Sequence, residues 1–494
     1  MPSDPIPRAA ETKPPVAVSA TELKRLASLA NVADYDRSTV RPSIVHIGVG
    51  GFHRAHLATY VHELLSAGRT DWGIVGVGLL PSDDAMAEAL EAQDCLYSLV
   101  SRGAGTTQVD IVGSILDYLL VSDNDTSAVV EVIAAPTTQI VSMTITEGGY
   151  PVDDASGAFL PDQCQPGSAF DVVAHGLEAR RRAGGAPLTV MSCDNIMGNG
   201  SVARTATLGA ASSIGPELIA WIESSVSFPN SMVDRITPVT AASDIDWLAR
   251  DIGIIDRWPV VAEPFRQWVI EDLFAGDRLP LEEMDVIVTD NIDPYELTKL
   301  RLLNAGHSCL AYLAALDGFN LVDTAMADPA LRRFIQTLLY REAKPTLPAA
   351  AGIDLDSYIE SLIERFSNPA IGDQISRLCL DGSAKFPKFL IPTVRAQIAN
   401  EGPVTLSALA FAGWAAYLAH GNVELSSDPL LDEAIAWAQQ STADPAAFLG
   451  FTAVFGTGLA DDPRFVDAFV SALSRLRTHG VQSAVAITLQ EAEH

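Results

Sequence analysis

The sequence predicts an α/β protein with two domains, the first built on a parallel sheet and the second mostly α-helical. In the stretch from Ser43 to Leu80, an apolar strand, a glycine turn, a helical pattern and a second apolar strand follow one another. Strand, helix and strand in this order form a βαβ unit, and such units build parallel sheets. After Asp290 strand-like patterns nearly disappear, and apolar residues recur at helical spacing.

The length of 494 residues is enough for two domains with separate cores. We expect a loose tail rich in Pro at residues 1–20, the sheet domain at 21–290 and the helical domain at 291–494. No apolar run has the roughly 18 to 20 residues of a membrane span, and the first residues lack the pattern of a signal peptide. We therefore expect a cytoplasmic protein.

The composition excludes several kinds of partner. The formal net charge of -30 disfavours nucleic acid and anionic lipid, because an acidic surface repels both. The five cysteines are widely spaced, which is typical of reduced thiols, and no convincing Cys, His and Glu cluster indicates zinc. A small molecule is the partner that this composition favours.

Three buried strands end in polar or turn-forming residues. One begins at Ile44 and runs into the glycine turn, another begins at Ile140 and ends in "TEGGY", and a third begins at Leu188 and ends at Asn195. In a doubly wound parallel sheet, ligands bind at the carboxyl ends of the strands. The sequence therefore predicts a ligand site at this edge.

The segment "GVGGFH" supplies Gly48 and Gly50 of the pattern G-x-G-x-x-G, with His53 in place of the third glycine. Gly48 permits a tight turn, and Gly50 lets a pyrophosphate approach the backbone and the helix behind it. We therefore predict a Rossmann-type domain that binds a dinucleotide, with a tight turn without ligand as the alternative. Arg54 is a candidate for a phosphate contact, whereas His53 and His56 could be packed or capped.

The acid that binds the adenine ribose is expected at the end of the second strand. Asp71 precedes that strand, whereas Asp83 follows it, with Asp84 next to it. A carboxylate at Asp83 favours the free 2′-hydroxyl of NAD over the phosphate of NADP. The alternative is that Asp83 caps the following helix.

The stretch "KLRLLNAGHS" places an amine, an amide and an imidazole among apolar residues. At about 100° per residue, Lys299, Asn304 and His307 lie at about 0°, 140° and 80° around the helix axis. Partial burial would lower the pKa of Lys299 so that its neutral amine accepts a proton. Asn304 could then donate to a developing alkoxide and His307 could orient a hydroxyl. The alternatives are a solvated lysine and polar residues that satisfy the backbone.

A second spacing in this helix suggests a different catalytic acid. Tyr295 and Lys299 form Y-x-x-x-K, the spacing used by short-chain dehydrogenases. Here the pair follows the expected dinucleotide domain, where a short-chain enzyme would already have ended. We therefore do not assign Tyr295 a catalytic role.

Several stretches together resemble the polyol-specific long-chain dehydrogenases. In order between about residue 44 and residue 390 they are "HIGVGGFHRAH", "QDCLYSL", "MTITEGGY", "TVMSCDN", "VSFPNSMVDRITP", "EPFRQWVIED", "KLRLLNAGH" and "DGSAKFPKF". The resemblance implies metal-independent hydride transfer between NAD and a sugar alcohol, interconverting D-mannitol and D-fructose in a monomeric enzyme. D-arabinitol, D-sorbitol or a uronate remain alternative substrates, and a sensor that binds NAD without turnover is a further alternative.

The resemblance also implies roles for residues of this chain. Lys299 corresponds to the general base that takes the hydroxyl proton, and Asn195 and Asn304 to the pair that stabilises the oxyanion. His307 corresponds to the histidine that positions substrate, and Glu147 to a glutamate that passes the proton to water. The implied substrate-pocket residues are Val233, Asp234 and Arg377, and the implied cofactor-binding residues are Gly48, Gly50, Gly51, Phe52, Arg54 and Asp83.

Two features qualify the expected specificity. Where the family often has an acidic pair after the second strand, this chain has Ser82 and Asp83, so discrimination against NADP is expected to be weaker. A uronate would need a basic partner for its carboxylate, and Arg235 and Lys385 are both candidates.

Overall fold

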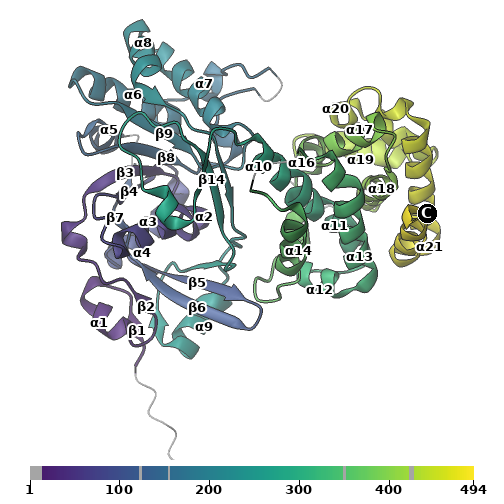
Figure 1. The fold of residues 1–494 in the computed structure, drawn as a ribbon, viewed down its shortest axis with the longest axis horizontal. Helices are drawn as coiled ribbons and strands as arrows, with labels where there is room; N and C mark the ends of the chain where they lie inside the picture. Colours follow the sequence, from purple (N-terminus) through teal and green to yellow (C-terminus); the bar gives the residue numbers. More distant parts are fainter. Residues whose placement is uncertain (1–13, 122–124, 154–155, 349–351, 422–427, 494) are drawn as a thin grey trace, which may run out of the picture. The chain divides into compact units, whose positions relative to one another are not determined.

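The computed structural model describes residues 14–121, 125–153, 156–348, 352–421 and 428–493. The chain divides into two compact units, Met1–Ile292 and Asp293–His494. The first unit contains the sheets with their covering helices, and the second is helical (Figure 1). The predicted fold class, a Rossmann-type parallel sheet followed by a mostly helical domain, is confirmed.

A six-stranded sheet with the order β10-β9-β8-β3-β4-β7 forms the centre of the first unit. All of its strand pairs are parallel. Its strands are β3 (Pro42–Ile47), β4 (Gly73–Gly78), β7 (Ile115–Leu120), β8 (Ile140–Met143), β9 (Leu188–Ser192) and β10 (Val226–Ser227). Chain order proceeds from β3 first to one side and then to the other, so the topological switch point lies at the carboxyl end of β3.

The sheet is covered on both faces, which explains its continuous apolar strands. Every residue of β4, β8 and β9 is buried. Along β3, Ile44 belongs to one core with residues of α3 (Leu57–Ser66), whereas Val45 belongs to a second core with residues of α5 (Ser127–Ala134) and α6 (Ala169–Arg182). Burial of both faces is the usual environment of a parallel sheet.

The single helix predicted after the glycine turn is divided in two. It consists of α2 (Gly51–Ala55) and α3, and His56 between them has φ -120° and ψ -92°. The His56 side chain is fully buried, and its Nε2 lies 3.0 Å from the carbonyl oxygen of Gln267 in β14. This contact to a distant strand replaces regular helical geometry at His56.

Three smaller sheets complete the first unit, and they were not predicted from the sequence. Their orders are β13-β5-β6-β2, β11-β14-β15 and β1-β12. Their strands are β1 (Val16–Ala17), β2 (Asn31–Val32), β5 (Tyr97–Gly103), β6 (Thr106–Val112), β11 (Ser231–Asp234), β12 (Ile254–Ile255), β13 (Val260–Ala262), β14 (Gln267–Glu271) and β15 (Ile287–Thr289). Because β1 pairs with β12, part of the segment expected as a loose tail belongs to a sheet; residues 1–13 lie outside the described residues.

The remaining helices of the first unit pack around these sheets. They are α1 (Leu23–Leu26), α4 (Asp84–Ala92), α7 (Asn199–Ser212), α8 (Pro216–Ser225) and α9 (Ala242–Trp247), with a π-helical turn at Leu248–Ile252 and 3-10 turns at Ala20–Glu22, Arg37–Thr39, Pro81–Asp83, Glu147–Gly149, Pro161–Gln163 and Leu281–Met284.

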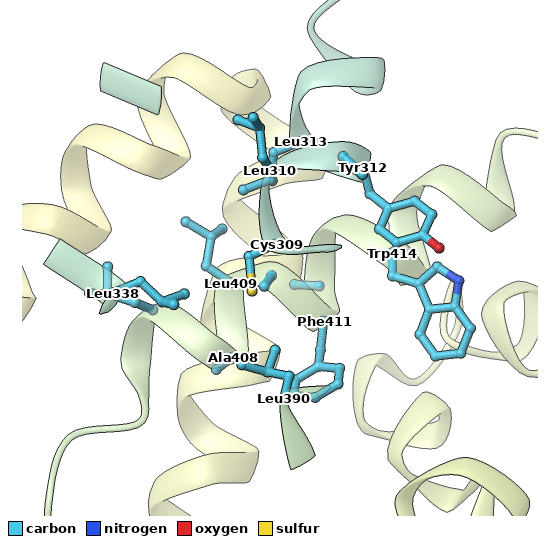
Figure 2. Packing of buried hydrophobic residues seen from close by; sticks show 14 of the residues in the cluster. Cys309, Leu310, Tyr312, Leu313, Leu338, Leu390, Ala408, Leu409, Phe411 and Trp414 are labelled. Carbon is cyan, nitrogen blue, oxygen red and sulfur yellow. The ribbon is translucent and has the colours of Figure 1, made fainter. Parts of the chain in front are cut away.

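The second unit is a bundle around two apolar helices, α11 (Ala305–Leu316) and α18 (Thr405–Ala419). Figure 2 shows Cys309 and Leu313 of α11 in the same core as Leu409 and Phe411 of α18. The other helices are α10 (Asp293–Thr298), α12 (Val322–Ala327), α13 (Pro329–Leu338), α14 (Leu355–Phe366), α15 (Ile375–Leu378), α16 (Gly382–Phe389), α17 (Ile391–Ala399), α19 (Leu431–Gln440), α20 (Thr452–Phe455) and α21 (Pro463–Glu493). π-Helical turns span Lys299–Asn304 and Leu339–Ala343, and 3-10 turns span Lys344–Thr346, Pro445–Gly450 and Leu459–Asp461.

A buried carboxylate holds the N-terminus of α18. Glu342 is fully buried and accepts hydrogen bonds from the backbone amides of Leu406 and Ser407, both at 2.8 Å, and from the Ser407 hydroxyl at 2.5 Å. Burial raises the pKa of Glu342 to about 7, although the three donors oppose the shift. Because the folded-state pKa lies above the unfolded value, Glu342 stabilises the fold fully below about pH 4.5 and loses that contribution as the pH rises through 7.

Comparison with Glu342→Gln, which cannot titrate, should expose this dependence. The free energy of unfolding of the wild type, relative to the variant, is expected to fall by about 2 kcal/mol between pH 5.5 and pH 8. Urea unfolding at the two pH values measures it, and the exposed Glu360→Gln is the matched control. A difference between wild type and variant that does not change with pH would contradict the prediction.

Candidate active site

The glycine turn lies at the switch point of the parallel sheet, between β3 and α2. Gly48 has φ +84°, and a Cβ there would lie 2.3 Å from the carbonyl oxygen of Thr144. Both the backbone conformation and the close approach therefore require glycine. Gly50 differs, because φ is -99° and a Cβ would meet nothing within 4 Å. Open space above Gly50, at the start of α2, is the arrangement that a pyrophosphate needs.

Two buried histidines pack next to this turn, His46 in β3 and His53 at the position of the third glycine. The His46 ring stacks on His53 with 3.4 Å between centroids, and both side chains are fully buried. The Thr144 hydroxyl donates its hydrogen to the carbonyl of Gly48 at 2.8 Å, so its oxygen accepts from His46 Nε2–H. Because the proton of His46 is then on Nε2, His46 Nδ1 accepts from the Ser142 hydroxyl. Burial lowers the pKa of His46 to about 3 and that of His53 well below its ordinary value, so both rings are neutral.

Phe52 and Arg54 line a pocket of about 330 Å³ that opens at the start of α2. The other lining residues are Gly51, Thr237, Pro238, Val239, Thr240, Ile245, Arg257, Trp258 and Pro259. The Phe52 ring stacks on His56 at 4.9 Å. Arg54 is 3% exposed, donates to the carbonyl of Trp258 and lies over the Tyr97 ring at 5.2 Å. A phosphate contact by Arg54 stays a prediction.

Asp83 lies at the carboxyl end of β4, beside the last residue of that strand. A Cβ on Gly78 would come within 3.0 Å of Asp83 Oδ2, so the carboxylate packs directly against the strand end. Its oxygen accepts the backbone amide of Leu80 at 3.0 Å and makes no capping hydrogen bond to α4. The same bond belongs to a capping box on the 3-10 turn Pro81–Asp83, which leads directly into α4, so Asp83 does cap the start of this helical segment. The half-buried carboxylate also stands where a ribose-binding acid is expected, and that role stays a prediction.

Glu147 and Asn195 follow adjacent strands of the same sheet. Glu147 begins a 3-10 turn after β8, and Asn195 follows β9. Both residues are exposed. Because β8 and β9 are parallel neighbours, these two residues lie at the same carboxyl edge as the glycine turn.

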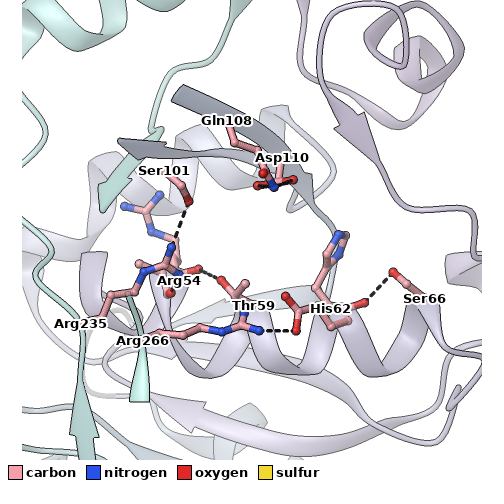
Figure 3. Close-up of polar contacts among 11 residues, drawn as sticks. Arg54, Thr59, His62, Ser66, Ser101, Gln108, Asp110, Arg235 and Arg266 are labelled. Atoms are coloured by element: carbon pink, nitrogen blue, oxygen red, sulfur yellow. Dashed lines mark hydrogen bonds and ion pairs between the residues drawn. The ribbon is translucent and has the colours of Figure 1, made fainter. Parts of the chain in front are cut away.

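Val233 and Asp234 are the last residues of β11, and Arg235 follows them. Val233 and Asp234 are each 4% exposed, in an antiparallel pairing with β14. Figure 3 shows the Arg235 guanidinium reaching Ser101, to which it donates at 3.0 Å. The same guanidinium donates to the carbonyl oxygens of Ala55 and Glu263. Because Arg235 is 7% exposed and three of its five N–H groups already donate to protein oxygens, it is a poor candidate for binding a substrate carboxylate.

In the second unit, Lys299 and Asn304 are the first and last residues of a π-helical turn. In a π-helix the hydrogen bonds join residues five apart, as between the Ala305 amide and the Leu300 carbonyl. Each residue of a π-helix turns the chain through a smaller angle than in an α-helix, so residues five apart are offset by less than in an α-helix. The expected offset of about 140° between Lys299 and Asn304, which assumed an α-helix, is wrong. The π-turn aligns their side chains more closely than predicted.

The Asn304 and His307 side chains have different surroundings. Asn304 Nδ2 is buried and has no hydrogen-bond partner among the described residues. The His307 ring stacks on Phe366 at 4.1 Å, and the Phe366 ring also lies where a Cβ on Gly306 would be, at 3.2 Å. The absence of a side chain at Gly306 thus lets an aromatic ring approach the helix closely. A buried amide donor without a partner costs free energy, which suits a position that a substrate oxygen completes.

The surroundings of three other charged residues in the second unit were not predicted from the sequence. The guanidinium of Arg377 pairs with both oxygens of Asp373 at 2.8 and 2.7 Å, and Lys385 donates to the carbonyl of Leu378 at 3.2 Å. Glu296, which sequence reasoning missed, is 6% exposed, and Lys299 is 8% exposed. Glu296 precedes Lys299 by one helical turn, so the i, i+3 spacing of an acid and a lysine was the available signal.

A glycine turn at the switch point of such a sheet, with a carboxylate at the next strand end, is typical of a dinucleotide-binding domain. The sequence profile of the mannitol dehydrogenase Rossmann domain matches residues 42–283, and that of the mannitol dehydrogenase C-terminal domain matches residues 291–477. The chain belongs to the mannitol dehydrogenase family, whose members are polyol dehydrogenases.

Known proteins resemble the chain over nearly its whole length. Mannitol 2-dehydrogenase of Phaeosphaeria nodorum is 41% identical over 483 residues, which cover 94% of this chain and 84% of that protein. The ternary complex of Pseudomonas fluorescens mannitol 2-dehydrogenase with NAD and D-mannitol has a TM-score of 0.86 at 39% identity, covering 96% of this chain and 100% of that one. A substrate-free D-sorbitol dehydrogenase has a TM-score of 0.85 at 38% identity, covering 95% and 100%.

Two further observations concern membranes and metals. Within the part of the chain that the structure describes, no helix is long and apolar enough to cross a membrane. Among the same residues, no three His, Cys, Asp or Glu side chains form a group that could hold a metal ion. The five cysteines are free thiols.

Proposed function

We propose that the protein is an NAD-dependent mannitol 2-dehydrogenase that interconverts D-mannitol and D-fructose without a metal. The observation that supports this proposal is the π-turn, which carries the buried Lys299 at one end and Asn304 at the other, where the buried Nδ2 of Asn304 has no hydrogen-bond partner among the described residues. The identity of the polyol is supported by relatives named mannitol 2-dehydrogenase, and by a solved relative whose complex contains NAD and D-mannitol. As the family resemblance implies, we further propose that the enzyme acts as a monomer.

The chemistry assigned to each residue follows from its type and burial. Lys299 takes the proton of the reacting hydroxyl, since this lysine is buried and its amine can accept a proton in its neutral form. Asn304 and Asn195 donate amide hydrogens to the oxyanion that forms. An uncharged donor stabilises the oxyanion by a hydrogen bond and does not pair with it as a fixed positive charge would. His307, held by its stack on Phe366, orients the substrate, and Glu147 passes the proton to water.

The glycine turn and Asp83 fit NAD. Gly50 and Gly51 leave room for the pyrophosphate at the start of α2, because a Cβ on either glycine meets nothing closer than 3.6 Å. The Asp83 carboxylate at the end of β4 would hold the ribose hydroxyls, and its charge disfavours a 2′-phosphate. When bound, NAD accepts the hydride from the carbinol carbon. Phe52 and Arg54 border the same turn.

D-sorbitol is the second candidate substrate, because a D-sorbitol dehydrogenase is nearly as similar in structure as the mannitol enzyme. Sorbitol and mannitol differ only in the configuration at one carbon, so both fit the same catalytic groups. A uronate is less favoured, since the guanidinium of Arg235 already donates to three protein oxygens.

A panel of substrates with both cofactors tests the proposal. NADH consumption is followed with D-fructose, D-xylulose and fructuronate, and NAD reduction with D-mannitol, D-sorbitol and D-arabinitol. We expect the highest kcat/KM for D-fructose and D-mannitol, lower values with NADP(H), and unchanged rates after treatment with a chelator. Higher kcat/KM for D-sorbitol would select the second candidate, and silence with every substrate would refute both.

A further inference from the structure

Two loops at the carboxyl edge of the sheet are joined by one buried side chain. The first loop, residues 144–150, follows β8 and contains Glu147; the second, residues 193–198, follows β9 and contains Asn195. The carboxylate of Asp194 in the second loop accepts the backbone amides of Ile145 and Thr146, each at 2.9 Å. A single carboxylate therefore fixes the first loop relative to the second.

The backbone held by Asp194 is strained. Thr146 has φ 61° and ψ 167°, a conformation that is almost confined to glycine. Threonine is β-branched, so its side chain makes this conformation less favourable still. Strain of this kind persists only where the surrounding structure imposes it, and here the amide of Thr146 itself is bonded to Asp194. Thr146 immediately precedes Glu147, so this conformation sets the direction in which Glu147 leaves the strand.

Asp194 is itself held by several partners. Its side chain is 8% exposed and accepts the Tyr150 hydroxyl at 2.7 Å, and Tyr150 lies 2.6 Å from the Ser192 hydroxyl. Its backbone carbonyl accepts from the side chain of Asn199 at 3.0 Å. A carboxylate fixed at both its side chain and its backbone transmits its position to the residue that follows, Asn195.

We propose that Asp194 is a positioning residue that sets Glu147 through the strained backbone of Thr146 and sets Asn195 through its own fixed backbone. The inference rests on the proposed function, because it assumes that Glu147 and Asn195 act in polyol oxidation. It assigns Asp194 no contact with substrate or cofactor. Misplacement of catalytic groups by a fraction of the reacting distance lowers the rate of the chemical step more than it lowers binding.

Asp194→Asn tests the inference, because the amides of Ile145 and Thr146 bind different oxygens of the carboxylate and the amide nitrogen that replaces one oxygen cannot accept a hydrogen bond. We expect kcat for D-mannitol to fall by about 100-fold, while the Kd for NADH, from fluorescence titration, stays within about twofold. Asp171→Asn is the matched control, because Asp171 also accepts a backbone amide in this unit, that of Gly167 at 2.9 Å, and kcat should be unchanged. Unchanged kcat in Asp194→Asn would overturn the inference.

A rescue separates positioning from a merely structural role. Glycine adopts the conformation of Thr146 without strain, so Thr146→Gly alone should keep most of kcat, and Thr146→Gly combined with Asp194→Asn should recover about tenfold of the loss. If Asp194→Asn fails to fold, Tyr150→Phe removes one donor to the carboxylate and should lower kcat by about threefold to tenfold. A loss of kcat in step with NADH affinity and with Tm, without recovery in the double variant, would assign Asp194 to folding alone and overturn the inference.

Parallel measurements on Glu147→Gln and Asn195→Ala distinguish failure of the positioning role of Asp194 from failure of the proposed function. Loss of kcat in these two variants but not in Asp194→Asn would overturn the positioning role and leave the proposed function intact. Full kcat in both of them would remove the roles assigned to Glu147 and Asn195, and the positioning role with them. Absence of polyol oxidation in the wild type would refute the proposed function itself.

Discussion

Replacing Lys299 with alanine is expected to lower kcat for D-mannitol by about 10²- to 10⁴-fold, the usual contribution of a general base. NADH affinity should remain close to that of the wild type, because Lys299 lies in the second unit whereas the glycine turn and Asp83 lie in the first. The rate of oxidation by the wild type should rise with pH as the base loses its proton, and this dependence should disappear in the variant. Steady-state kinetics across pH and fluorescence titration with NADH measure both quantities.

Two controls sharpen the Lys299 experiment. Lys344→Met removes a partly exposed lysine that pairs with Asp356 in the same unit, and kcat should not change. A small primary amine added to Lys299→Ala should restore part of the activity, since the truncated side chain leaves room for an external base. Full activity in Lys299→Ala would exclude Lys299 as the base, and a parallel loss of activity and NADH affinity would indicate a structural role.

Substitution by alanine is expected to weaken NADH binding at both glycines of the turn but to lower Tm at only one of them. In Gly48→Ala, the methyl group would lie 2.3 Å from the Thr144 carbonyl oxygen at φ +84°, so we expect a lower Tm together with loss of NADH binding. In Gly50→Ala, the methyl group enters open space at an ordinary φ, so Tm should be unchanged. NADH binding by Gly50→Ala should nevertheless weaken by about tenfold or more, because the methyl group occupies the approach of the pyrophosphate.

Gly105→Ala is the control for backbone strain in this pair. Gly105 has φ +83° in the turn between β5 and β6, and a Cβ there meets nothing within 4 Å. Its substitution should lower Tm through the backbone conformation alone and leave NADH affinity intact. Thermal unfolding and NADH titration of the three variants decide the outcome. Normal NADH affinity in Gly50→Ala would show that the turn does not carry the pyrophosphate.

Local patterns were enough to predict the main elements of the first unit. The run from Ile44 to Gly50 predicted β3 and its turn, and the apolar runs at Ile140 and Leu188 predicted β8 and β9. Each is a continuous apolar segment followed by turn-forming residues, so neighbours in sequence determine it. The three smaller sheets were not predicted, since β1 pairs with β12 and β2 with β6 across long separations that no local pattern encodes.

The candidate site was predicted less completely, because its geometry depends on contacts between distant residues. The environment of Arg235 needs acceptors from Ala55, Ser101 and Glu263, and none of these is near it in sequence. Asp194 was passed over for the same reason, since its partners lie in the loop after β8. The π-turn at Lys299 escaped because a helical wheel assumes a constant number of residues per turn.

The π-turn joins α10 and α11 into one continuous helical segment and changes the rotation of one helix relative to the other. Compared with an α-helix, a π-turn accommodates one additional residue, so the faces of α10 and α11 are rotated relative to each other. The face of α11 that carries Cys309, Leu310 and Leu313 is fixed by the apolar core. Leu302 and Leu303 of the π-turn belong to the same core, so the additional residue changes the direction of Lys299 relative to these leucines and to α11. The length of the turn is therefore a second way, besides substitution, in which the direction of this side chain can change during evolution.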